Sequence, residues 1–265
     1  MIIHNLDPII IDFGLIQIRW YSLAYIFGII LGWWYGKKLI KIQLENNKIK
    51  SYSDNFDDLI GYIIIGIILG GRLGYVIFYN PSFYLDNFFE IFKLWKGGMS
   101  FHGGLIGVIV SIYFFSIIKK LDYKLYFDTI SCVAPIGIFL GRIANFINSE
   151  LYGLPTNKFW GIIFPKVDSI PRHPSQIYEA ILEGIVLFVI LNYLIRKRVF
   201  KNGGTSLVFL IFYGIFRIIS EQFRQPDQQL GYLYNTLSMG SLLSLVMIIL
   251  GIIFLTKFFL NEKYK

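Results

Sequence analysis

The chain of 265 residues contains a single cysteine, Cys132, and three histidines. One cysteine cannot form a disulfide within the chain or build a cysteine metal site, and the apolar neighbours of Cys132 indicate a small buried residue. The motifs GxxxxGK[ST], HExxH, CxxC and GxSxG are also absent. Nucleotide hydrolysis by a P-loop, zinc proteolysis and a serine esterase elbow therefore lack their parts. We expect neither a bound metal nor a cofactor.

Charge is also scarce, because charged residues make up only 16% of the chain and hydrophobic residues 55%. Several apolar runs reach about 20 residues, the length that an α-helix needs to cross a bilayer core. The sequence therefore predicts an all-α, polytopic membrane protein that forms one domain over residues 1–265. The net charge of +8 comes from basic residues in the short connections between these runs, where they set topology, so we expect no nucleic-acid partner.

Seven transmembrane helices are predicted, and they cover residues 20–40, 59–79, 98–118, 127–147, 175–195, 205–223 and 236–260. The polar stretch that ends at Asp58 is expected to be a loop, and the interrupted aromatic segment 80–97 to lie at the membrane interface. In the second predicted span, Gly66, Gly70 and Gly74 recur at every fourth position. Small residues at this spacing let another helix approach closely.

Lysine and arginine are concentrated in the connections after the first, third and fifth predicted spans and at the C-terminal end. The positive-inside rule makes these parts cytoplasmic, so the N-terminus faces outward and the C-terminus lies in the cytoplasm. Residues 1–14 lack a basic region and a small-residue cleavage site, and we therefore expect the first span to direct insertion itself. His4, ahead of that span, is expected to be a solvated tail residue.

Three arginines lie inside predicted spans: Arg72, Arg142 and Arg217. At 1.5 Å per residue, all three are expected in one layer, roughly 7 to 12 Å below the outer rim of the membrane. Three guanidinium groups at one depth suggest a site for an anion, with few acidic residues near it. The alternative is that each side chain extends to the outer headgroups, as arginines near helix ends often do.

Polar residues accompany two of these arginines. Arg142, Asn145 and Ser149 are expected on one helix face, with Asn148 and Glu150 next to them. Tyr213, Arg217 and Glu221 follow each other at intervals of four, so Glu221 can hold Arg217 across one helical turn. The alternative for this second stripe is an ion pair that only joins helices.

Two further histidines could contribute to a site. His102 lies about one turn into the third predicted span, in the predicted arginine layer and among glycines that leave the backbone open to a ligand, and a neutral imidazole there could act as a general base. It could equally be hydrogen-bonded between helices. His173, between Pro171 and Pro174 in an outer loop, suits a structural or substrate-contact role as well as a chemical one.

Guanidinium, amide, imidazole and tyrosine groups at the outer leaflet suit a phosphate-bearing lipid, because arginine can donate two parallel hydrogen bonds to phosphate oxygens. Motifs across nearly the whole chain support this. They are WYSLAY (20–25), GGRLGYVIFYN (70–80), HGGLIG (102–107), GRIANFINSELYG (141–153), RHPSQIYE (172–179) and YGIFRIISEQFRQPDQQ (213–229). In this order, the chain resembles the bacterial prolipoprotein diacylglyceryl transferases.

The resemblance implies an enzyme of the bacterial cytoplasmic (inner) membrane, with its active site toward the outer leaflet and membrane lipids around it. Such an enzyme moves the sn-1,2-diacylglyceryl group of phosphatidylglycerol to the lipobox cysteine thiol in the signal peptide of a preprolipoprotein. This forms a thioether, releases glycerol 1-phosphate and is the first step of lipoprotein maturation.

The resemblance also suggests roles for individual residues. His102 is the candidate base for the thiol, and Arg142 and Arg217 are the candidates that stabilise the leaving phosphate. The expected substrate-binding or orienting residues are Tyr21, Arg72, Asn145, Asn148, Glu150, Gly153, Tyr213, Glu221 and Arg224.

Two other classes of protein remain possible from the residues alone. A lipid transporter could use the arginines as an anion relay, although carriers more often show inverted repeats or helices broken at the membrane midplane. A lipid-binding scaffold without catalysis would carry similar groups.

Overall fold

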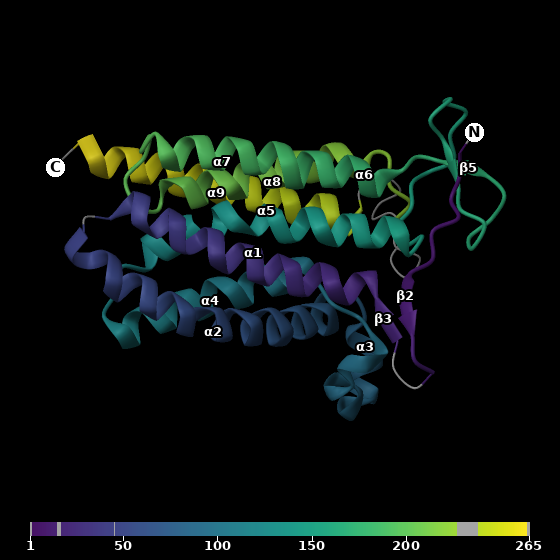
Figure 1. Cartoon of the computed structure of the whole chain (residues 1–265), viewed down its shortest axis with the longest axis horizontal. Coiled ribbons are helices and arrows are strands. Elements are labelled where there is room, and N and C mark those ends of the chain that lie inside the picture. Colours follow the sequence, from purple (N-terminus) through teal and green to yellow (C-terminus); the bar gives the residue numbers. More distant parts are fainter. Residues whose placement is uncertain (1, 15–16, 45, 227–237, 264–265) are drawn as a thin grey trace. The chain divides into compact units, whose positions relative to one another are not determined.

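The computed structural model describes residues 2–14, 17–44, 46–226 and 238–263 (Figure 1). The chain divides into two compact units, Met1–Gly36 with Ile130–Lys265, and Lys37–Thr129. The short strands are β1 (Ile2–Ile3), β2 (Ile9–Asp12), β3 (Gln17–Arg19), β4 (Ile162–Ile163) and β5 (Pro171–Arg172). The helices are α1 (Trp20–Gln43), α2 (Asn46–Phe78), α3 (Pro81–Asp86), α4 (Phe101–Lys119), α5 (Tyr123–Ile147), α6 (Ser175–Glu179), α7 (Leu187–Arg196), α8 (Gly204–Glu221) and α9 (Met239–Lys263). Two 3₁₀ segments, η1 (Phe88–Phe92) and η2 (Leu94–Lys96), and one π-helical segment, η3 (Ala180–Val186), complete the set.

Six helical segments of the described chain are long and apolar enough to cross a membrane. They are Lys48–Phe78, Phe101–Lys119, Tyr123–Ile147, Ser175–Arg196, Gly204–Glu221 and Met239–Leu260. The predicted polytopic, mostly helical membrane protein is therefore confirmed. The first predicted span is a continuous helix, α1, of 24 residues. The helix α1 is not among the six segments, because its tryptophans and tyrosines are less hydropathic than aliphatic residues and lower its mean hydropathy. The seventh crossing and the orientation of the termini remain predictions.

The predicted loop before Asp58 is wrong, because α2 already begins at Asn46. Ser53, Phe56, Leu59 and Ile63 are buried, and they follow one another at intervals of three or four residues. This spacing places one stripe of the helix against its neighbours while the polar residues between them remain outside. The stretch is polar in composition but amphipathic in pattern.

In the second unit, α2 and α4 pack at backbone contact through their glycines. A Cβ atom at Gly70 would collide with the Gly103 carbonyl oxygen and lie 2.9 Å from the Gly107 Cα, and one at Gly74 would lie 2.6 Å from the Gly103 Cα. The prediction that these glycines admit a second helix is therefore confirmed. Backbone atoms cannot move aside as a flexible side chain can, so this contact fixes the spacing of the two helices.

We expect Gly70→Ala to destabilise the folded protein by about 1 to 3 kcal/mol, because the added methyl group overpacks the α2–α4 contact. Gly61→Ala is the matched control, since a Cβ at Gly61 in the same helix meets no atom within 4 Å. Thermal unfolding in detergent measures both. Equal melting temperatures for the two variants would contradict the assignment.

His4 is a buried residue at 6% exposure, not the solvated tail residue that the sequence suggested. Strand β1 pairs in parallel with β4, and β4 pairs antiparallel with β5. The His4 backbone N–H then donates to the Ile163 carbonyl at 2.9 Å, and its ring lies 3.2 Å from the Ser149 hydroxyl and between Phe146 and Phe164. The start of the chain is thus attached to the end of α5.

Burial lowers the pKa of His4 below its usual value, and the charge of Lys166 acts in the same direction. The unfolded chain therefore binds more protons than the folded one, and the β1–β4 pairing should weaken as the pH falls below about 6.5. Hydrogen exchange of residues 2–4 and 162–163, corrected for intrinsic rates, should rise between pH 7.5 and pH 5.5. His4→Asn keeps a polar partner for Ser149 and cannot be protonated there, so its exchange should lose this pH dependence. The same dependence in the variant would exclude His4 as its cause.

In the first unit, α7, α8 and α9 lie side by side (Figure 1). The run α6–η3–α7 is one continuous helix with a π-helical middle, a feature often found at functional sites. Gly184 in η3 permits a close approach to α5, because a Cβ there would lie 2.7 Å from the Phe139 Cβ. This contact brings the carboxylates of the α6–η3 run toward the arginine of α5.

Candidate active site

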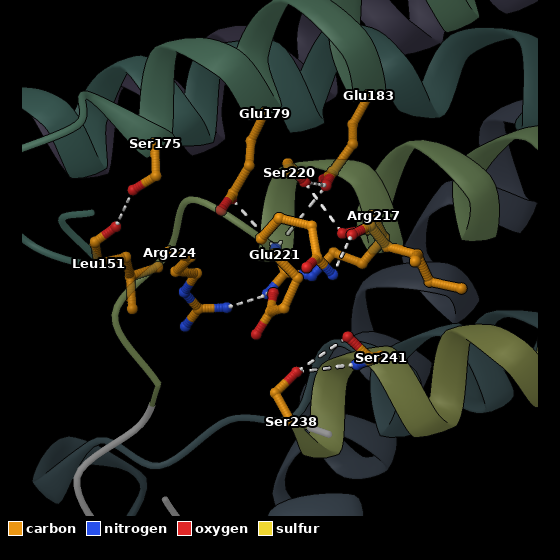
Figure 2. A network of polar contacts seen from close by, with 12 residues as sticks. Leu151, Ser175, Glu179, Glu183, Arg217, Ser220, Glu221, Arg224, Ser238 and Ser241 are labelled. Atoms are coloured by element: carbon orange, nitrogen blue, oxygen red, sulfur yellow. Dashed lines mark hydrogen bonds and ion pairs between the residues drawn. The ribbon is translucent and has the colours of Figure 1, made fainter. Parts of the chain in front are cut away.

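Glu179, at the end of α6, joins two of the predicted arginines. Its Oε2 lies 2.8 Å from the Arg142 Nε of α5 and 3.1 Å from the Arg217 Nη1 of α8. Figure 2 shows Glu179 and Arg217 side by side. One carboxylate oxygen between two guanidinium groups holds both cations close together inside the first unit.

Glu183, one helical turn further along, makes a second bridge. Its carboxylate lies 3.3 Å from the Arg142 Nη2 and 3.7 Å from the Arg217 Nη1. The Ser220 hydroxyl of α8 donates to its Oε1 at 3.2 Å. Glu179 and Glu183 therefore connect α5 and α8 through the same pair of arginines.

The predicted hold of Glu221 on Arg217 is confirmed. The Arg217 Nη2 lies 2.7 Å from the Glu221 Oε2, and the Arg224 Nη1 lies 3.6 Å from the same oxygen (Figure 2). Tyr213, four residues before Arg217, is 1% exposed and lies within electrostatic range of both Arg142 and Glu183. The polar stripe predicted on this helix thus faces the same ion pairs.

Six residues form what we call the arginine–glutamate cluster: Arg142, Arg217, Arg224, Glu179, Glu183 and Glu221. The three positive and three negative charges balance, as buried ions require. Arg142 has the most exposed side chain of the six at 14%, and the others range from 0% to 7%. Its Nε and Nη2 contact glutamates, whereas its Nη1 makes no hydrogen bond or ion pair with any described residue. The cluster can therefore offer a fixed donor to an oxyanion.

The expectation that acidic residues are few in this layer is wrong, and Glu179 and Glu183 are the functional candidates that it missed. Both lie in an otherwise apolar run, Ser175–Arg196, four residues apart. Carboxylates inside a membrane span are costly and mark either partners or functional sites. This signal was present in the sequence, and it pointed to the missing counterions of the arginines.

A second polar group lies at the C-terminal end of α5 and in the residues that follow it. The Asn145 Nδ2 donates to the Glu150 Oε2 at 3.2 Å, and the Asn148 Nδ2 donates to Oε1 at 3.3 Å. Glu150 is exposed, while Asn145 is 5% exposed. The predicted position of Ser149 on the Arg142 face is wrong, because the helix ends at Ile147 and Ser149 has a φ of 59°.

Gly153 provides close backbone approach, as predicted. Its N–H donates to the His173 carbonyl at 3.0 Å, and it forms an isolated antiparallel bridge with Arg224. A Cβ there would collide with the carbonyl oxygens of His173 and Phe223. The loops around the arginine–glutamate cluster therefore meet at a position that admits no side chain.

Tyr21 lies in the first turn of α1, and its hydroxyl is 3.5 Å from that of Tyr25. Tyr25 in turn lies within electrostatic range of Arg142 and Glu150. The structure thus brings the predicted residue Tyr21 to the same end of the first unit, and it adds Tyr25, which the sequence analysis did not single out.

A cavity of about 350 Å³ opens beside the cluster and is lined mainly by apolar side chains. Ser220 belongs both to its wall and to the partners of Glu183. In the wall of this cavity, the His173 Nδ1 lies 3.1 Å from the Tyr178 hydroxyl, which accepts a hydrogen bond from the Trp160 Nε1 at 2.9 Å. His173 has a structural position here, and burial lowers its pKa.

Arg72 and His102 belong to the second unit. The Arg72 guanidinium is buried and donates to five carbonyls of the segment between α2 and α4, those of Glu90 (2.6 Å), Ile91 (2.8 Å), Lys93 (3.3 Å), Gly97 (2.5 Å) and Gly98 (3.2 Å). These bonds attach that segment to α2. The segment is interrupted, as predicted, because it consists of the three short pieces α3, η1 and η2; its place at the membrane interface stays a prediction. Lipid contact by Arg72 remains a prediction.

His102 occupies the first turn of α4, after the N-cap residue Ser100, whose hydroxyl accepts a hydrogen bond from the Gly103 N–H at 3.2 Å. Its ring stands edge-on to that of Phe101. The helix begins at Phe101, three residues after the predicted start of the third span, so His102 lies in its first turn. The role of His102 as a base stays a prediction.

Apolar helices that can cross a membrane and a buried, charge-balanced arginine–glutamate cluster together define an integral membrane protein with a polar site inside its helical bundle. The family model described as prolipoprotein diacylglyceryl transferase matches residues 8–257, and the chain belongs to this family. Proteins named phosphatidylglycerol–prolipoprotein diacylglyceryl transferase are similar to this chain over nearly its whole length. The one from Rickettsia typhi is 51% identical over 253 residues, covering 95% of this chain and 96% of its own, and the one from Rickettsia bellii is 49% identical over 259 residues, covering 97% of each.

We expect Glu183→Gln to destabilise the protein by about 3 to 5 kcal/mol, because it leaves buried guanidinium charge without compensation. Asp57→Asn is the control, since the Lys37–Asp57 pair at 2.8 Å has side chains 28% and 45% exposed and contributes at most about 1 kcal/mol. Unfolding in detergent measures both free energies. A loss for Glu183→Gln no larger than that of the control would show that the cluster is not held by its charges.

Proposed function

We propose that this chain is a phosphatidylglycerol–prolipoprotein diacylglyceryl transferase. It transfers the sn-1,2-diacylglyceryl group of phosphatidylglycerol to the thiol of the lipobox cysteine in a preprolipoprotein signal peptide. The new C–S bond replaces the C–O bond to phosphate, the thiol proton passes to a base, and glycerol 1-phosphate leaves. Membership in the family and the names of the relatives support this reaction.

One observation carries the proposal at the level of the site, namely that Arg142 and Arg217 share the Glu179 Oε2 within membrane-spanning helices. As the C–O bond breaks, negative charge grows on the departing phosphate. Fixed donors aimed at that charge lower the barrier because they need no reorganisation during the reaction. Glu179 and Glu183 hold the Arg142 guanidinium through its Nε and Nη2, so its Nη1 can donate to the departing phosphate.

The other predicted residues take supporting roles in this proposal. Tyr213, Glu221 and Arg224 orient Arg217, and the Asn145–Asn148–Glu150 group and Tyr21 contact the glycerol headgroup. Gly153 keeps the loops close, and Arg72 supports the segment before His102. His102 is our candidate base for the lipobox thiol, since a thiol attacks as thiolate and imidazole accepts protons near neutral pH.

The apolar cavity beside Ser220 favours a lipid substrate, because the donor's acyl chains can remain in hydrocarbon while its phosphate reaches the cluster. We further propose that residues 1–265 act as one transferase domain in the bacterial inner membrane, with the site toward the outer leaflet. The Rickettsia relatives and the distribution of basic residues support this location.

The test incubates purified protein in detergent with phosphatidylglycerol and a lipobox peptide, and follows the lipidated peptide by mass and the released glycerol phosphate. We expect both products in equal amounts, and none with a peptide whose cysteine is replaced by serine. A wild-type protein that gives neither product would refute the proposed transferase.

Arg142→Lys keeps a positive charge beside Glu179 and Glu183 but removes the planar guanidinium donor. Arg142→Lys and His102→Ala should each lower turnover by at least a hundredfold while the protein remains folded in the membrane, because they remove an oxyanion donor and the base. Arg196→Ala is the control. Arg196 contacts the Tyr35 hydroxyl at 2.8 Å at the other end of α7 and should be dispensable. Full activity in either test variant would remove that residue from the mechanism.

A further inference from the structure

The first turn of α9 lies against the arginine–glutamate cluster. Ser238 caps this helix, because its hydroxyl oxygen accepts a hydrogen bond from the Ser241 N–H at 3.1 Å and its carbonyl accepts one from the Leu242 N–H at 3.1 Å. Ser238 and Ser241 are 7% and 6% exposed. Figure 2 shows both serines below Glu221. The capped end of α9 is thus a buried neighbour of the site.

Gly240, in this first turn, faces the Glu221 carboxylate. A Cβ atom at Gly240 would stand 3.2 Å from the Glu221 Oε1 and 3.4 Å from both Cδ and Oε2. The 3.2 Å distance to Oε1 is shorter than ordinary van der Waals contact and the other two are at its lower limit, so the carboxylate would have to move by a few tenths of an ångström. The backbone at Gly240 does not require glycine, since its φ is not positive, and alanine stabilises helices relative to glycine. The close approach of Glu221 is the physical reason for a glycine here.

The displaced group would be the one that holds Arg217. The Glu221 Oε2 lies 2.7 Å from the Arg217 Nη2 and 3.6 Å from the Arg224 Nη1. Arg217 in turn shares Glu179 with Arg142. The helix N-terminus carries partial positive charge, which favours a carboxylate beside it and adds to the attraction of the two guanidinium groups.

We propose that the N-terminus of α9, through Gly240, positions Glu221 and thereby orients Arg217 toward the phosphate of the donor lipid. This rests on the proposed function. Gly240 is a positioning residue that acts through Glu221. The effect should appear in the chemical step, because Arg217 gains most from charge that develops as the phosphate leaves.

The test compares Gly240→Ala with Gly251→Ala, a matched change further along α9. A Cβ at Gly251 would lie 2.7 Å from the Ile211 Cγ1 and 3.3 Å from the Leu207 carbonyl, so this control disturbs the same helix pair without touching a carboxylate. We expect Gly240→Ala to lower kcat roughly tenfold, with the KM for phosphatidylglycerol changed by no more than about twofold. Gly251→Ala should melt earlier than wild type, and its kcat should stay within about twofold.

A second pair of variants adds no atoms at the contact. Ser238→Ala removes the cap of α9 and should lower kcat a few-fold, whereas Ser238→Thr keeps a capping hydroxyl and should retain the wild-type kcat. If Gly240→Ala does not fold, this pair still tests whether the N-terminus of α9 positions Glu221. Full kcat in Gly240→Ala, an equal loss in Gly251→Ala, or full kcat in Ser238→Ala would each overturn the inference. Absence of transfer by the wild-type protein would instead overturn the proposed function, so the two failures can be told apart.

Discussion

Mutual compensation of six buried charges is the constraint on which the first unit depends. Arg142, Arg217 and Arg224 come from α5, α8 and the residues just after α8, and Glu179, Glu183 and Glu221 come from the α6–η3 run and α8. A single ionised side chain without a partner of opposite charge would be costly inside a membrane-spanning bundle. The helices must therefore approach closely. This explains the glycines at positions such as Gly184 and Gly240, where atoms of another residue occupy the space that a side chain would need.

The same compensation gives the site its chemical character. Glutamates hold two guanidinium groups in a defined direction, so the cluster is neutral in total but directional in its hydrogen bonding. The Arg142 Nη1 is the donor that the described residues leave open. A preorganised donor of this kind can stabilise a departing phosphate without the cost of arranging itself during the reaction.

Much of this could be predicted from the sequence, since apolar run length fixed the helical membrane class and the i,i+4 spacing gave the Arg217–Glu221 pair. Glu179 and Glu183 were missed because their partners lie far away in sequence, and only packing brings α5, the α6–η3 run and α8 together. The burial of His4 had the same cause, since its pairing with residues near Ile163 is long-range. The helical start of α2 was missed because composition was considered without its periodicity.

We propose that the arginine–glutamate cluster binds the phosphate of the donor lipid through Arg142. The most direct measurement is an experimental structure of the protein in lipid nanodiscs with a non-reactive phosphonate analogue of phosphatidylglycerol. We expect a phosphonate oxygen at about 3 Å from the Arg142 Nη1, with Glu179 still between Arg142 and Arg217. A phosphonate group bound elsewhere, with no contact to either arginine, would contradict it.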